Sequence, residues 1–341
     1  MILKNSVVGS ILIFVFISMN LLIVDAQEKV ANQSKELPVN RIPHNGEAAE
    51  AYLSPDGFHL ICDAKLEGED NIHVYTLNID GTEMCRINDK GVDACSYYFP
   101  DGNKLIWTST RDSFDCPDDS YSDPLHYPQG AELFISDLDG NILKRLTNND
   151  YYDAEVSVSP NGDSILFTRQ IDGKSDLWRM NTDGSGEFQI THTPDWQEGG
   201  SFYMPDNETI VYRAWKIEDQ GKRSFPMTLF TINKDGTGRR ALTHDDGTNW
   251  SPYPAPDGKH IVFVKVLNEP NKPPNYEIFL LNIETGEQRR LTYNKAFDAF
   301  PTISKDGKTM VFSSSRDAKP GERKLFLYTM DISSLNLGIF N

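Results

Sequence analysis

The 341-residue sequence is poor in basic residues, with 33 Lys and Arg against 50 Asp and Glu and a formal net charge of −17. A nucleic-acid-binding protein needs a basic face that displaces counterions from phosphates, so this composition argues against that class of partner. The sequence contains no Cys-x-x-Cys, no Gly-x-Ser-x-Gly and no His-x-x-x-His. It therefore lacks the usual motifs of zinc knuckles and dithiol redox sites, of α/β-hydrolase nucleophiles and of helical histidine zinc sites.

Long apolar runs are absent after the first 26 residues. Val7 to Val24 is almost uninterrupted apolar sequence, Lys4 precedes it, and Val24 and Ala26 fit the −3 and −1 positions of a cleavage site. We predict a signal peptide over residues 1–26 and a periplasmic or secreted protein with no membrane span after its removal. The run of about 18 residues is long for a signal peptide, so an uncleaved anchor is the alternative.

The remaining sequence is a six-fold repeat. Each copy contains a tight turn of the type Ser54-Pro55-Asp56-Gly57, and the Asp or Asn of the six turns occupies positions 56, 101, 161, 206, 257 and 306. Asp bonds its own backbone and Gly tolerates positive φ, which makes Asp-Gly a strong turn signal. Two short runs rich in Ile, Val, Phe, Tyr and Trp follow each turn, and five copies end in a short run such as Arg145-Leu146-Thr147. Short, evenly spaced antiparallel strands are typical of β-propellers.

The sixth copy lacks the closing run, whereas Val39 to Pro43, ahead of the first copy, matches that run in form. We therefore predict an all-β, six-bladed β-propeller over residues 38–331, with four antiparallel strands per blade and a ring closed by the N-terminal strand. Residues 27–37 are predicted to be a linker, and residues 332–341 a C-terminal tail.

The repeats resemble the WD-repeat-like propeller repeats of the TolB family. Ser304 to Asp317, which reads Ser-Lys-Asp-Gly-Lys-Thr-Met-Val-Phe-Ser-Ser-Ser-Arg-Asp, is the copy most similar to the family pattern. The resemblance covers about residues 38–331 and implies a propeller that binds a protein or peptide partner in the bacterial envelope. Similar propellers also form some oligogalacturonate lyases, which hold a metal in the funnel. The alternative is therefore an enzyme, a lyase or hydrolase acting on saccharides with a metal-assisted funnel site.

Two columns of the repeat provide the candidate site, because the first strand of each propeller blade lines the central channel. Eight residues before the turn Asp stand Ala48, Asp93, Asp153, Glu198, Asn249 and Asp298; six residues before it stand Glu50, Cys95, Glu155, Gly200, Ser251 and Phe300. We predict an acidic binding site at the channel mouth formed by Asp93, Asp153, Glu155, Glu198, Asn249, Trp250, Asp298 and Phe300.

Such a carboxylate ring would attract a cation or a basic segment of a partner. We expect no cofactor; if the ring holds a metal, its oxygen ligands favour Ca²⁺, and Asp153, Glu198 and Asp298 are the candidate ligands. In the alternative interpretation, these acids cap backbone N–H groups in the turns between blades, and the neighbouring aromatic residues pack between blades.

The second copy is lengthened by a loop over residues 112–130, which we interpret as a recognition loop or lid at one face. All four cysteines lie in the first two copies. A disulfide between Cys95 and Cys116 would tie this loop to the channel-lining strand, and four free thiols are the alternative. Because the sequence supplies carboxylates but no nucleophile and no histidine cluster, we expect a binding protein rather than an enzyme.

Overall fold

The computed structural model describes residues 36–113, 121, 127–222, 225–322 and 324–339. Residues 37–341 form one compact unit, distinct from residues 1–36. The predicted signal peptide over residues 1–26 lies outside the described residues. Within the described part of the chain, no helix is long and apolar enough to cross a membrane.

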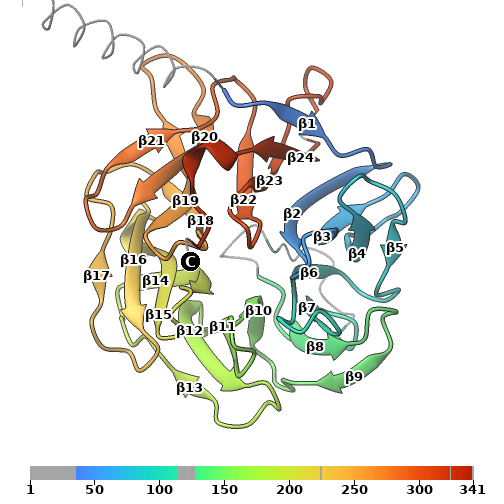
Figure 1. Cartoon of the computed structure of the whole chain (residues 1–341). Coiled ribbons are helices and arrows are strands. Elements are labelled where there is room, and N and C mark those ends of the chain that lie inside the picture. Colours follow the sequence, from blue (N-terminus) through green and yellow to red (C-terminus); the bar gives the residue numbers. More distant parts are fainter. Residues whose placement is uncertain (1–35, 114–120, 122–126, 223–224, 323, 340–341) are drawn as a thin grey trace, which may run out of the picture. The chain divides into compact units, whose positions relative to one another are not determined.

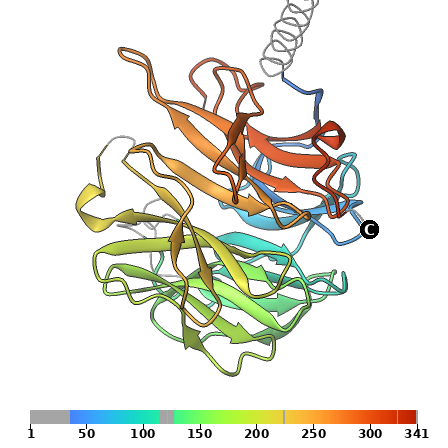
Figure 2. The same ribbon diagram turned by 60° about the vertical axis from the view of Figure 1, so that its left-hand side comes forward.

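Six four-stranded antiparallel sheets surround a central axis, which confirms the predicted propeller (Figures 1 and 2). Blade 1 contains β2 (Glu47–Leu53), β3 (His59–Lys65), β4 (His73–Asn78) and β5 (Cys85–Arg86). Blade 2 contains β6 (Asp93–Tyr98), β7 (Leu105–Ser109), β8 (Glu132–Ser136) and β9 (Ile142–Arg145). Blade 3 contains β10 (Tyr152–Val158), β11 (Ser164–Ile171), β12 (Lys174–Asn181) and β13 (Phe188–Gln189).

Blade 4 contains β14 (Trp196–Tyr203), β15 (Thr209–Lys216), β16 (Thr228–Asn233) and β17 (Arg240–Ala241), with a 3₁₀ turn, η1 (Ile217–Asp219), after β15. Blade 5 contains β18 (Asn249–Pro254), β19 (His260–Leu267), β20 (Asn275–Asn282) and β21 (Gln288–Arg290). Blade 6 contains β22 (Asp298–Ile303), β23 (Thr309–Ser314), β24 (Phe326–Asp331) and the N-terminal strand β1 (Val39–Arg41). The first strand of each blade lies nearest the axis (Figure 1).

The N-terminal strand closes the ring as predicted. β1 pairs antiparallel with β24, with Val39 opposite Met330 and Arg41 opposite Tyr328. The predicted tail beyond β24 contains a short 3₁₀ turn, η2 (Ser333–Leu335), after which Leu337 is buried and its carbonyl accepts a hydrogen bond from the Asp257 N–H. The chain end therefore packs against the first turn of blade 5.

The repeated turn residues act as the sequence predicts. In blade 1 the Ser54 hydroxyl donates to Asp56, and Asp56 in turn accepts the N–H of Phe58. Gly57 has a φ of 77°, a value that costs little only for glycine. The turn therefore satisfies its own backbone groups and fixes where the second strand of the blade begins.

A β-bulge interrupts the innermost strand of every blade. The register shifts at this point in all six sheets, between Ala49 and Tyr52 in blade 1 and between Ala154 and Ser157 in blade 3. One residue per bulge has a positive φ near 50°; these residues are Glu50, Cys95, Glu155, Gly200, Ser251 and Phe300. They are the six residues of the column six positions before the turn. A bulge re-aims a side chain relative to a regular strand, and this decides which column reaches the channel.

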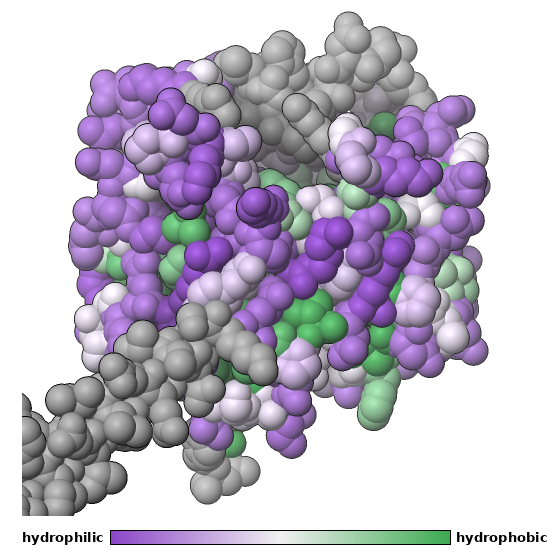
Figure 3. Space-filling view, turned by 90° about the horizontal axis from the view of Figure 1, so that it is seen from above, coloured by the Kyte–Doolittle hydropathy of each residue, from purple (hydrophilic) through white to green (hydrophobic). Residues whose placement is uncertain are grey.

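Figure 3 views the molecule from above, over the part of the ring that carries β20, β24 and β1. This face is mostly hydrophilic, with hydrophobic residues in separate patches. Isolated exposed hydrophobic residues of this kind are normal on a protein surface.

Candidate functional site

Of the six residues that stand eight positions before the turn, five lie at the joints between consecutive blades. Asp93, Asp153, Glu198, Asn249 and Asp298 are all almost fully buried. Each is bonded to a residue in the linker from the preceding blade, and the five pairs are Asp93–Asn88, Asp153–Asn149, Glu198–Thr193, Asn249–Asp245 and Asp298–Asn294. These five bonds join side chains, not the backbone N–H groups of the turn-capping alternative, and they connect each blade to its predecessor.

Arginines neutralise three of these buried carboxyls. Asp153 accepts both Nε and Nη2 of Arg169, at 2.6 and 2.8 Å. Arg316 contacts Asp298 at 3.1 Å, and Arg239 contacts Glu198 at 3.3 Å. Burial nevertheless raises the pKa of Glu198 to about 7. The three proposed calcium ligands therefore serve three different joints. Among the described residues, no group of three or more His, Cys, Asp or Glu side chains is arranged to hold a metal ion.

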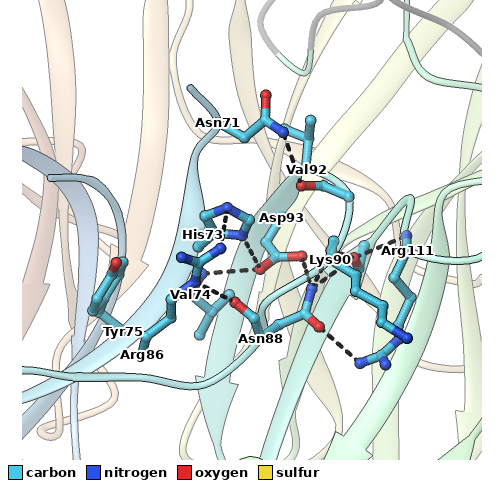
Figure 4. A network of polar contacts seen from close by, with 12 residues as sticks. Asn71, His73, Val74, Tyr75, Arg86, Asn88, Lys90, Val92, Asp93 and Arg111 are labelled. Carbon is cyan, nitrogen blue, oxygen red and sulfur yellow. Dashed lines mark hydrogen bonds and ion pairs between the residues drawn. The ribbon is translucent and has the colours of Figure 1, made fainter. Parts of the chain in front are cut away.

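The joint between blades 1 and 2 has a different set of partners (Figure 4). Asp93 accepts the Val74 N–H at 3.1 Å and the Asn88 amide at 2.6 Å. His73 Nε2 lies 2.6 Å from the Arg86 guanidinium, which can only donate, so this nitrogen must be the acceptor. The other ring nitrogen, Nδ1, faces Asp93 at 3.4 Å.

A cavity of about 630 Å³ lies at the end of the channel where the innermost strands begin. All six bulge residues line it, together with residues from the ends of β3 and β15, from the start of β20 and from the segments that lead into β4, β8, β16 and β24. Its volume is within the range of small-ligand and peptide side-chain pockets.

The acidic side of the cavity is built on blades 1 and 2. The Tyr52 hydroxyl donates to the Glu50 carboxyl at 3.1 Å, and the Cys95 thiol lies 4.0 Å from the same carboxyl. Asp63, from β3, accepts the Cys95 N–H at 3.0 Å through Oδ2, and its Oδ1 has no hydrogen-bond partner among the described residues. Burial, followed by the charge of Glu155, raises the pKa of Glu50 to about 7. Burial and the charge of Glu50 also raise the pKa of Asp63.

Blades 3 and 4 contribute the ion pair of the cavity. Glu155 accepts Arg213 Nη2 at 2.5 Å, the Gly200 N–H at 2.7 Å and the Thr168 hydroxyl at 2.8 Å. The Arg213 guanidinium carbon also lies 4.8 Å from the centre of the Trp215 ring. Glu155 thus accepts three hydrogen bonds, and its carboxylate compensates the charge of Arg213 within the protein.

The opposite side of the cavity is aromatic. The rings of Trp250 and Phe300 meet edge to face at 4.9 Å, and Phe297 lies 6.2 Å from Trp250 and 4.6 Å from Tyr276. These residues come from blades 5 and 6 and line the cavity. Their ring faces can accept apolar groups or cations.

Below the cavity, four rings from four blades meet across the axis. Tyr52, Tyr97, Phe202 and Tyr253 have centroid separations of 5.0 to 6.2 Å, and the hydroxyls of Tyr97 and Tyr253 are 3.1 Å apart. Tyr52 and Phe202 also line the cavity. This aromatic cluster forms the floor under the carboxyl groups.

Of the eight residues predicted for the channel mouth, Asp93, Glu155, Trp250 and Phe300 line the cavity. Asp153, Glu198, Asn249 and Asp298 are described residues outside that lining. Cys95 is buried in the cavity wall, whereas Cys116, its proposed disulfide partner, lies outside the described residues. Tyr121 and Tyr127, from the long loop over residues 112–130, also line the cavity.

Sequence reasoning did not identify Asp63 and Arg213. Both stand seven residues after the turn Asp of their repeat, in the otherwise apolar runs Leu60 to Ala64 and Ile210 to Trp215. A charged residue inside a buried strand requires a partner or a function. That signal was present in the sequence.

Searches with protein-family models find no match to the chain. A TolB homologue of Chlorobium luteolum is 25% identical over 193 residues, which are 55% of this chain and 36% of that protein. An uncharacterised protein of Agrobacterium fabrum is 27% identical over 166 residues, which are 45% of this chain and 52% of that protein. The matches thus span about a third to a half of these relatives.

Solved structures share the propeller over most of the chain. A putative TolB from Agrobacterium tumefaciens has a TM-score of 0.57 at 19% identity and covers 86% of this chain and 96% of its own. TolB from Acinetobacter baumannii has a TM-score of 0.55 at 18% identity, covering 85% and 65%. An oligogalacturonate lyase in complex with manganese reaches 0.54 at 15% identity, covering 86% and 93%. At these identities the structures show the shared fold alone. The chain is a TolB-like six-bladed β-propeller, distantly similar in sequence to a TolB homologue.

Proposed function

We propose that this chain is an exported binding protein of the bacterial envelope and that it engages a protein or peptide partner in the cavity at the channel mouth. The observation that carries the proposal is the cavity itself, which all six blades line with carboxyl groups on one side and aromatic rings on the other. Concave sites with a largely apolar lining and a few convergent polar groups are the usual ligand sites of proteins.

The proposed location rests on two independent features. The first 26 residues have the composition of a signal peptide. The TolB homologue of Chlorobium luteolum and the solved TolB structures provide the second feature, because the resemblance to TolB implies the periplasm. The net charge of −17 agrees with a partner that offers basic groups, since opposite charges steer association.

The test is affinity capture from envelope extracts with the parent chain, a Trp250→Ala variant and a Phe188→Ala variant. Trp250 lines the cavity, whereas Phe188 is an exposed aromatic residue on the outermost strand β13. We expect the parent and Phe188→Ala to retain the same partner and Trp250→Ala to lose at least about tenfold in affinity, as is usual for a central aromatic contact. Melting curves of both variants verify the fold. Equal retention by a folded Trp250→Ala variant would exclude the cavity as the binding site.

A further inference from the structure

The cavity is chemically divided between two halves of the ring. All five carboxyl groups that line it belong to blades 1, 2 and 3: Glu47, Glu50, Asp63, Asp93 and Glu155. Blades 5 and 6 contribute no charged residue to the described lining; their residues are Thr248, Trp250, Ser251, Tyr276, Phe297, Phe300 and Leu325. A ligand that fills the cavity therefore meets acidic groups at one end and aromatic rings at the other.

The acidic half is not neutralised from within the protein. Arg213 is paired with Glu155, and the ammonium group of Lys65 donates to the carbonyl of Asp70. Within the described residues, Glu47, Glu50 and Asp63 form no ion pair. The pKa values of Glu50 and Asp63 are raised, and a cationic side chain beside them would favour their charged forms.

Three buried polar atoms in the cavity wall also lack partners. Asp63 Oδ1, Arg213 Nη1 and Trp215 Nε1 make no hydrogen bond among the described residues, and Trp215 is only 1% exposed. Native proteins satisfy nearly all buried polar groups, so such atoms next to a cavity indicate a missing partner. An acceptor on blade 1 and donors on blade 4 match a ligand that carries both kinds of group, as a peptide backbone does.

We propose that the occupant is a peptide segment in which a Lys or Arg stands close to an aromatic or large aliphatic residue. The basic side chain enters the half bounded by Glu50 and Asp63, and the apolar side chain packs on Trp250 and Phe300. This inference rests on the proposed function and specifies the partner of that same site. A purely acidic segment would meet Glu47, Glu50 and Asp63 with no countercharge, and a purely basic one leaves the aromatic half unfilled.

The test uses acetylated, amidated peptides with Lys and Phe separated by zero to four glycines, titrated into the full chain up to millimolar concentration and followed by ligand-observed NMR. Two matched series replace Lys by Glu or Phe by Ala. We expect at least one Lys–Phe spacing to bind at least about tenfold more tightly than both counterparts.

The Glu50→Gln/Asp63→Asn double variant should lose the preference for Lys, and Trp250→Ala the preference for Phe. Glu83→Gln, in an exposed turn, should retain both.

Equal affinity of the three series, or no binding at any spacing, would overturn the inference. Either result leaves the proposed function open to its own test, because capture of a partner that depends on Trp250 does not require this ligand chemistry. Loss of both peptide binding and Trp250-dependent capture would reject the two together.

Discussion

Deletion of residues 36–46 is expected to lower the melting temperature by more than about 10 °C or to prevent folding. The deletion removes β1 and leaves β24 as an open edge. It also removes the hydrogen bond from the Ile42 N–H to the Leu327 carbonyl. Ile42 is 2% exposed and packs in one cluster with Leu327. Its loss therefore opens the packing between blades 1 and 6.

The control for this deletion moves the same residues to the other end of the chain. Because β1 runs antiparallel beside β24, residues 36–46 placed after residue 341 can form the fourth strand of blade 6 in the usual hairpin order. We expect this circular permutant to recover most of the lost melting temperature. A deletion variant that melts like the parent in thermal denaturation would show that ring closure contributes little to stability.

Glu50 should make the protein less stable as the pH rises from 4.5 to about 7. Burial, followed by the charge of Glu155, raises the pKa of this carboxyl from 4.5 to about 7. Within this interval the folded chain holds a proton that the unfolded chain has released, so the folded state loses stability as pH increases. The full benefit is present below pH 4.5 and is lost once the pH passes about 7.

The Glu50→Gln variant isolates this contribution from the many other titrating groups. Glutamine has nearly the same shape as the protonated acid and can still accept from the Tyr52 hydroxyl. We expect the variant to gain stability relative to the parent as pH increases, by about 2 kcal/mol between pH 4.5 and pH 8. Urea denaturation at several pH values measures it. A difference between the two proteins that does not change with pH would mean that Glu50 titrates normally.

The propeller could be predicted because its determinants are local and repeated six times. Asp56 and Gly57 make one turn, and the same turn recurs wherever the chain must reverse at that edge of a blade. Even the closure was visible, since the sixth repeat lacks a closing run and the segment at Val39 has its form. These patterns are set by residues that are close together in the sequence, so they can be recognised without a structure.

The site was harder to predict because both faces of each sheet pack against neighbouring blades. In a regular strand, residues two positions apart share a face, so Asp153 and Glu155 were assigned together to the channel mouth. The bulge breaks this rule: Asp153 stays in the joint with Arg169, whereas Glu155, with a φ of 53°, lines the cavity. No sequence motif predicts the bulge, because its positive-φ position accepts residues as different as Gly200 and Phe300.

Site-specific photo-crosslinking in cells that express the full chain can locate the partner on the propeller. Ile72 and Phe58 are both exposed hydrophobic residues of blade 1, 43% and 67% exposed. Ile72 lines the cavity, whereas Phe58 lies in the turn at the far end of β2. A benzophenone amino acid is placed at each position in turn. If the partner binds in the cavity, we expect one discrete crosslinked partner at position 72 and none at position 58. A partner that crosslinks at position 58 and not at position 72 would contradict it.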